Sequence, residues 1–140
     1  MTRDRLPQCA DQYFLTDGGL ETTLIFHEGI QLPHFAAIDL LKNAFGCEVL
    51  RKYFQTYARL AQTYRAGCVL ESATWRASLD WGDKLGYSPQ ALADLNRRAI
   101  ALLRDIRSEF ETPTTPVVIS GCLGPRGDGY VPDQPMTAAA

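Results

Sequence analysis

The sequence lacks the features of three classes of protein. It has no basic excess, since 14 Lys and Arg stand against 16 Asp and Glu for a net charge of −2. Nucleic-acid binding therefore has no electrostatic support. No apolar stretch approaches the length of a membrane span. The start, MTRDRLPQCADQ, has no apolar region of a secretory signal, and no N-x-S/T acceptor site occurs. These absences favour a cytoplasmic protein that binds neither nucleic acid nor membranes.

Cysteine and histidine are too sparse and scattered to form a local metal motif. Cys9, Cys47, Cys68 and Cys122 include no C-x-x-C pair, and the two histidines lack H-E-x-x-H spacing. We expect free thiols, with Cys68 buried in an apolar run, and we assign no metal ligand. Neither a G-x-G-x-x-G after the first apolar run nor a G-x-x-x-x-G-K-S/T motif is present, which argues against a nucleotide-binding fold.

What the sequence does contain is an alternation of short apolar runs and amphipathic helices. The runs at 13–15, 68–70 and 117–119 predict strands. Between them, residues 47–67 and a segment that begins at Ser88-Pro89 predict helices, because apolar side chains recur at three- and four-residue spacing. Serine is a favoured N-cap and proline a favoured first helical residue.

The two predicted helices differ in how their ends are marked. Gly67 is expected to take the left-handed cap of the first helix, and "ETPTTP" ends the second. The first stripe comprises Leu50, Tyr53, Phe54, Tyr57, Leu60, Ala61 and Tyr64, and the second Leu92, Leu95, Ala99, Leu102, Leu103, Ile106 and Phe110. Continuous apolar strands alternating with helices indicate an α/β fold, a parallel sheet covered by helices.

All three predicted strands end in polar or glycine-rich sequence. The exits read TDGGLETT, ESATWRAS and SGCLGPRGDGY. Ligands of α/β proteins bind at the carboxyl ends of parallel strands, so Asp17 is expected to point into a shared mouth where Gly18 and Gly19 allow close approach of backbone. A tight turn is the plainer explanation of D-G-G. Glu71, directly after a buried strand, should be partly buried.

Together, the motifs DGGLETTL, GCVLESATWRAS and SGCLGPRGDGY resemble the homocysteine S-methyltransferase family. The resemblance runs from about Phe14 to Thr137. It implies a zinc-dependent (β/α)8 barrel of the TIM type that transfers a methyl group to the sulfur of homocysteine, giving methionine. Cysteine-bound zinc in that family holds the substrate sulfur as a thiolate, which attacks a methyl group on a cationic donor.

The resemblance also assigns substrate-binding residues. Asp17 would hold the ammonium of homocysteine, and Trp75, with Trp81 as a second candidate, would offer an aromatic face to the donor. Arg76 stands where the betaine-using branch has an aromatic residue and would repel a quaternary ammonium, which favours S-methylmethionine or S-adenosylmethionine. The full set is Asp17, Gly18, Gly19, Glu21, Glu71, Ser72, Thr74, Trp75, Arg76 and Gly121, and no catalytic residue is assigned.

The family's zinc-binding cysteines lie in its C-terminal half, and none of the four cysteines here matches them. A complete barrel needs roughly 250 residues, so residues 1–140 are expected to be its N-terminal part, about three strand–helix units, without the C-terminal half. Zinc would belong to the complete domain. The short chain should be inactive and should self-associate through open sheet edges. The alternatives are a non-catalytic half-barrel that serves as a structural or interaction module, and an unrelated barrel enzyme that shares only the strand-end glycines.

Overall fold

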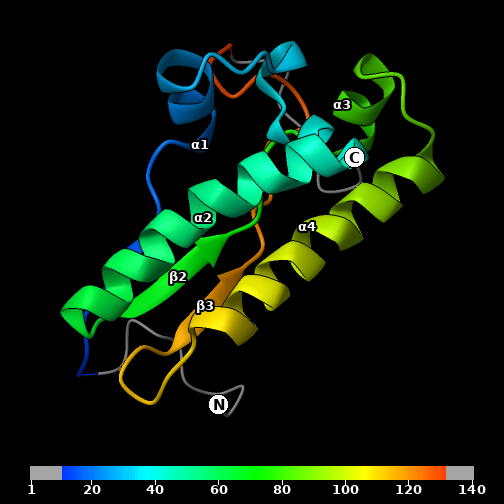
Figure 1. Ribbon diagram of the computed structural model, residues 1–140. Coiled ribbons are helices and arrows are strands. Elements are labelled where there is room, and N and C mark those ends of the chain that lie inside the picture. The colour runs from blue at the N-terminus through cyan, green and yellow to red at the C-terminus, as the bar shows by residue number, and fades with distance from the viewer. Residues whose placement is uncertain (1–10, 132–140) are drawn as a thin grey trace.

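The computed structural model describes residues 11–131 and contains one parallel sheet covered by helices (Figure 1). The strands are β1 (Phe14–Thr16), β2 (Gly67–Glu71) and β3 (Val117–Ser120). The α-helices are α1 (Leu20–Thr22), α2 (Ala44–Tyr64), α3 (Leu79–Lys84) and α4 (Pro89–Phe110), and the other helical segments are the π-helix η2 (Thr23–His27) and the 3₁₀ helices η3 (Pro33–Phe35) and η4 (Ala37–Lys42).

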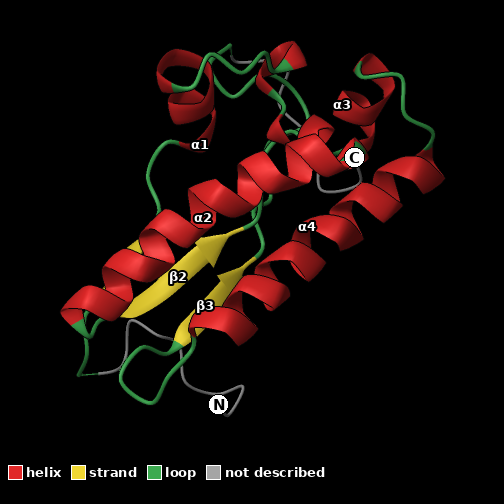
Figure 2. Cartoon of the chain, viewed as in Figure 1, coloured by secondary structure: helices red, strands yellow, loops and turns green. Residues whose placement is uncertain are grey.

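The three strands follow one another in the sheet in the order of the chain, and both pairs are parallel. Cys68 of β2 lies between Leu15 of β1 and Val117 of β3. The two long helices, α2 and α4, pack against each other and lie side by side over one face of this sheet (Figure 2). The predicted parallel sheet with covering helices is therefore confirmed, and it is compatible with the first part of a (β/α)8 barrel.

The core lies between the helices and the sheet. Cys68 and Leu70 of β2 and Val117 of β3 are fully buried. Every apolar residue predicted for the stripe of α4 is buried, and its N-cap Ser88 Oγ accepts a hydrogen bond from Ala91 N at 3.2 Å. The long α4 is therefore specified by its own periodicity and by the Ser88-Pro89 start.

Helix α2 begins earlier than predicted and ends differently. It starts at Ala44, where Asn43 Oδ1 accepts from Gly46 N at 2.9 Å. The prediction that Gly67 caps the helix is wrong: Arg65 takes the left-handed conformation, with a φ of 52°. Gly67 instead starts β2, where a Cβ would lie 2.4 Å from the ring of Phe14 on the neighbouring strand. The glycine is needed for cross-strand packing.

The predicted stripe of α2 is wrong at its outer members. Leu60 is 45% and Tyr64 71% exposed, whereas Ala58 and Ala61 are fully buried. Small residues thus make the close contact in the last turns, and the larger side chains point away.

The segment between the first two strands also differs from the expected pattern. Strand β1 lies one residue later than predicted, and Tyr13 is 90% exposed. The apolar run Leu24-Ile25-Phe26 belongs to the π-helix η2. None of the helices in the described part of the chain is both long and apolar enough to cross a membrane.

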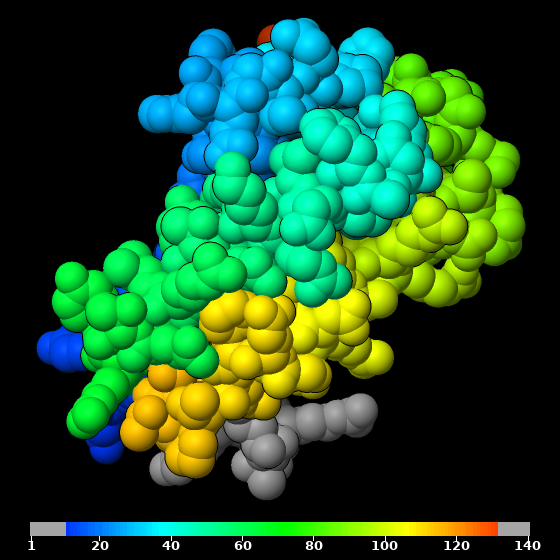
Figure 3. Space-filling view, viewed as in Figure 1, coloured from blue at the N-terminus to red at the C-terminus, as the bar shows by residue number. Residues whose placement is uncertain are grey.

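The carboxyl ends of the strands point to one end of the molecule. The segments around α1, η2 and η4 and around α3 gather there, beyond the surfaces of α2 and α4 (Figure 3). This end carries the polar strand exits, so the fold itself brings together residues far apart in the sequence.

Candidate functional site

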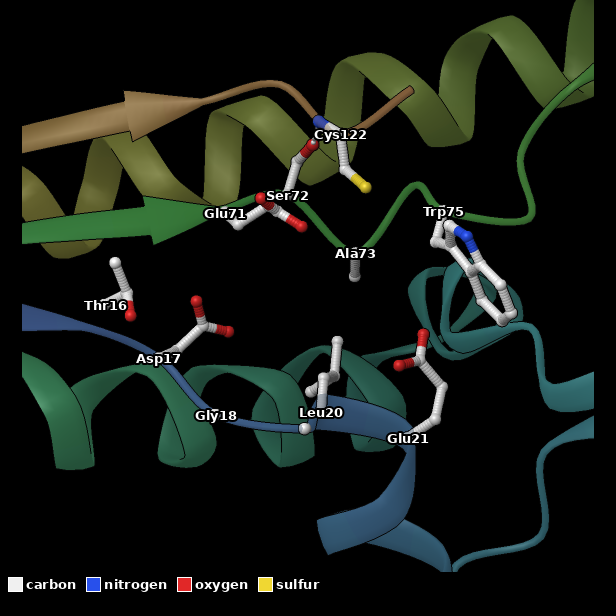
Figure 4. A pocket seen from close by; sticks show the side chains of 11 residues that line it. Thr16, Asp17, Gly18, Leu20, Glu21, Glu71, Ser72, Ala73, Trp75 and Cys122 are labelled. Carbon is white, nitrogen blue, oxygen red and sulfur yellow. Dashed lines mark hydrogen bonds between the residues drawn. The ribbon is translucent and has the colours of Figure 1, made fainter. Parts of the chain in front are cut away.

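The three strand exits meet around one cavity of about 340 Å³, which we call the first cavity. Asp17 and Glu21 lie on one side and Glu71, Ser72 and Cys122 on the other (Figure 4). Its size is within the usual range of small-molecule pockets, about 300–1,000 Å³. The lining comprises Thr16, Asp17, Gly18, Gly19, Leu20, Glu21, Glu71, Ser72, Ala73, Trp75 and Cys122. The predicted shared mouth at the strand ends therefore exists.

Asp17 follows β1 directly and is supported from behind by α2. The hydroxyl of Tyr53 lies 3.3 Å from Asp17 Oδ2 and donates to Gly18 O at 2.9 Å. Burial raises the pKa of Asp17 above its usual value, the Tyr53 hydrogen bond opposes this, and the negative charge of Glu71 adds to it. A cation in the cavity would relieve that like-charge repulsion. The sequence predicted Tyr53 only as a member of the apolar stripe and not as a site residue. Helical periodicity indicates that the side chain is buried, but it does not indicate the hydrogen-bond partner of the hydroxyl.

Two further carboxylates complete the acidic lining. Glu21, in α1, is half-buried, and burial raises its pKa, with the charge of Asp17 acting in the same direction. Glu71 ends β2 and is exposed. The expectation that Glu71 would be partly buried is wrong, because the strand ends where the cavity opens. The carboxylates of Asp17, Glu21 and Glu71 make the first cavity suited to a positively charged group.

Cys122, not Gly121, lines the first cavity from the third exit. Gly121 is exposed and lies outside this lining. Burial and, after it, hydrogen bonding to Glu71 together raise the pKa of the Cys122 thiol to about 12. The thiol is therefore protonated at neutral pH and is not a nucleophile. The sequence signal for Cys122 was its position one residue past the predicted exit glycine.

Ser72 and Thr74 join the second exit to the third. Ser72 Oγ lies 2.7 Å from Thr74 Oγ1 and accepts from Cys122 N at 3.0 Å, while Thr74 Oγ1 donates to Cys122 O at 2.8 Å. Both residues are buried. Ser72 lines the first cavity, but Thr74 does not. Their hydroxyls hold the backbone of Cys122 in place, and direct contact of either with substrate remains a prediction.

A second cavity of about 550 Å³ adjoins the first and shares Gly19, Glu21 and Trp75 with it. Its lining is Gly19, Glu21, Thr22, Phe35, Trp75, Arg76, Asp128 and Tyr130. The guanidinium of Arg76 lies over the rings of Trp75 and Trp81, at 4.7 and 4.1 Å from their centroids. Lys84 Nζ also lies over Trp81, at 4.1 Å. Protein cations thus occupy the aromatic faces that the sequence offered to a cationic donor.

Two glycines permit the close packing of the exits. A Cβ on Gly18 would lie 2.8 Å from Tyr57 Oη, and a Cβ on Gly124 only 1.8 Å from Trp75 O. Gly18 has no positive φ, so D-G-G is not a left-handed turn. Gly18 is required because Tyr57 of helix α2 packs directly behind it. Gly124 allows the backbone of the third strand exit to pack against the backbone of the second.

The residues present do not fit a zinc ion. Among residues 11–131, no group of three or more His, Cys, Asp and Glu side chains could hold a metal. Cys122, the one cysteine that lines the first cavity, would supply one thiolate, fewer than the three protein ligands of a catalytic zinc site.

Comparison with known proteins agrees with the motifs at the strand exits. A family model described as homocysteine S-methyltransferase matches residues 14–139. No curated protein and no solved structure was matched. The matched stretch spans β1, β2, β3 and both cavities. The chain belongs to the homocysteine S-methyltransferase family.

Proposed function

We propose that the first cavity binds homocysteine and that the protein transfers a methyl group to its sulfur. One observation carries the proposal: three carboxylates from two strand exits surround a cavity sized for a small molecule in a chain of this family. The ammonium of an amino acid would neutralise part of this charge. Asp17 is the anchor because Tyr53 holds it in position, and the backbone amides of Gly18 and Gly19 would face the substrate carboxylate.

The donor we propose is a sulfonium compound, S-methylmethionine or S-adenosylmethionine. The homocysteine sulfur forms a bond to the methyl carbon while the donor's sulfur–carbon bond breaks and its electron pair returns to that sulfur. The products are methionine and a neutral thioether, and the thiol proton is released to solvent. Zinc finds no ligand set among residues 11–131, so no step here depends on it. We propose that any zinc of the complete domain is held by other residues.

The test is ligand binding by the product of the whole reading frame that encodes these residues, called here the translated protein. Calorimetry compares L-homocysteine with 4-sulfanylbutanoate, which lacks the amino group. We expect the analogue to bind at least about tenfold more weakly, because a hydrogen-bonded charge contributes roughly 1.5–3 kcal/mol. Asp17→Asn should remove this difference, whereas the control Asp80→Asn, which lines neither cavity, should leave it.

Methyl transfer is then measured as methionine formed from homocysteine and each sulfonium donor. In the translated protein, Asp17→Ala should raise the KM for homocysteine sharply. An unchanged KM would remove Asp17 from the site. Equal binding of homocysteine and the analogue would exclude the acidic cavity as the homocysteine site.

A second candidate function is a non-catalytic half-barrel that acts as an interaction module. In the described residues, β1 and β3 each pair only with β2, which leaves one unpaired edge on each outer strand. Open edges favour association with another chain. We propose that a polypeptide limited to residues 1–140 self-associates and transfers no methyl group. Sedimentation that shows a monodisperse monomer with cooperative melting contradicts this, and the gene sequence beyond Ala140 distinguishes an enzyme from a module.

A further inference from the structure

We propose that the second cavity binds the carboxylate of a sulfonium amino acid and that Arg76 recognises it by exchanging Asp128 for the ligand. The inference deepens the proposed function, since it selects among cationic methyl donors. It stands on the geometry of Arg76, on the weakness of its ion pair and on the charges of the cavity.

The guanidinium of Arg76 is held in one orientation. The side chain is only 9% exposed, lies over Trp75 and Trp81, and donates from Nη1 to His34 O at 2.5 Å. Its Nε is buried and has no hydrogen-bond partner among the described residues. A fixed guanidinium with unused donor capacity binds a carboxylate with little loss of side-chain entropy.

Asp128 now occupies the position that we assign to the ligand carboxylate. Its Oδ1 lies 3.3 Å from Arg76 Nη2, longer than the roughly 2.7–2.9 Å of a strong charge-assisted bond. The Asp128 side chain is 40% exposed, and Oδ1 also accepts from Tyr130 N at 3.0 Å. The pair is long and open to solvent on the Asp128 side, so a ligand carboxylate can replace Asp128 and keep the buried guanidinium paired.

The charges of the second cavity select the rest of the ligand. Glu21 and Asp128 against Arg76 leave one net negative charge on the lining. A sulfonium amino acid carries an ammonium, a sulfonium and a carboxylate, hence one net positive charge. Betaine is neutral overall, and its quaternary ammonium would lack the indole faces that Arg76 and Lys84 occupy. The cavity therefore complements S-methylmethionine-type compounds in the sign of the net charge, and Arg76 supplies a partner for their carboxylate.

The experiment measures the affinity of the translated protein for S-methyl-L-methionine and for its carboxamide, which differ only in the carboxylate. We expect the carboxamide to bind about tenfold more weakly in the wild type. Arg76→Gln should reduce this ratio to about one. Asp128→Asn should increase the ratio, because it frees Arg76 from its internal competitor. The matched control Asp80→Asn, which removes the nearby ion pair to Arg126, should leave the ratio unchanged.

The readout separates recognition from a structural role. If Arg76 only holds the fold, Asp128→Asn leaves the ratio unchanged, and that result overturns the proposal even when Arg76→Gln fails to fold. Absence of S-methyl-L-methionine binding in the wild type also overturns it. Homocysteine binding at Asp17 is measured separately, so loss of the proposed function and loss of this inference give different results.

Discussion

The two cavities share three lining residues but differ in how the protein treats charge. In the first cavity, the carboxylates of Asp17, Glu21 and Glu71 have no basic side chain among the lining residues. In the second, Arg76 is already covered by two indole rings and an aspartate. The charged side chains that line the first cavity are thus all acidic, whereas the second cavity contains a positive group that already has an acidic partner.

The difference shows that neighbouring cavities on one rim can present side chains of opposite charge, carboxylates in the first and a guanidinium in the second. The two tryptophans differ in their surroundings. Trp75 lines both cavities, whereas Trp81 is buried and donates from Nε1 to Pro125 O at 3.3 Å. Both indole rings already make cation–π contacts with the protein's own side chains, Trp75 with Arg76 and Trp81 with Arg76 and Lys84.

The largest expected effect comes from Gly124→Ala, which should damage the second cavity more than the first. The new Cβ would lie 1.8 Å from the backbone oxygen of Trp75, so the segment that carries Asp128 must move. We expect a loss of about 1–3 kcal/mol in the free energy of unfolding, measured in urea. The ratio of the affinities for S-methyl-L-methionine and for its carboxamide should also change. Gly121→Ala is the control, since nothing lies within 4 Å of its Cβ. Equal effects of both would contradict the close packing of the exits.

A smaller effect is expected from pH, and it should distinguish the first cavity. Asp17 and Glu21 have raised pKa values, so they lose charge at higher pH than ordinary carboxyls, and homocysteine affinity should fall early on acidification. We expect proton release on binding in mildly acid buffer, measured by calorimetry in two buffers of different ionisation enthalpy. Asp17→Asn should reduce that release. A proton count unaffected by the substitution would contradict the assignment.

The raised pKa of Asp17 also affects the stability of the unliganded protein. Because the pKa of Asp17 is higher in the folded than in the unfolded protein, ionisation of Asp17 destabilises the fold at neutral pH. This penalty disappears as pH falls below the unfolded value. Asp17→Asn should therefore raise the melting temperature at pH 7 while weakening homocysteine binding, and the gain should vanish in acid.

The smallest effect is expected from Ser72→Ala, which removes the hydroxyl that joins the second and third exits. The amide of Cys122 and the hydroxyl of Thr74 would each lose a partner, at a cost of about 1–2 kcal/mol in the free energy of unfolding. Thr74→Val should cost a similar amount, and the double variant less than the sum, because the two hydroxyls act together. Additive costs would show that the hydroxyls act independently.

Much of the fold could be predicted because it depends on local patterns. Helix α4 was predicted with its cap, its length and its entire buried face. Helix α2 was predicted less well, since its left-handed residue is Arg65, and Gly67 is explained only by the Phe14 ring across the sheet. Packing partners far apart in sequence decided those details.

The sequence by itself determined that three polar strand exits follow three buried runs, and parallel pairing then required them to meet at one edge. Only the tertiary structure decided what each exit residue faces. Tyr53 reaches Asp17 from helix α2, Thr74 is engaged by Cys122, and Arg76 lies between indole rings. The physical reason is that periodicity specifies which face of an element is buried, whereas charge and hydrogen-bond partners depend on distances between elements that no local pattern encodes.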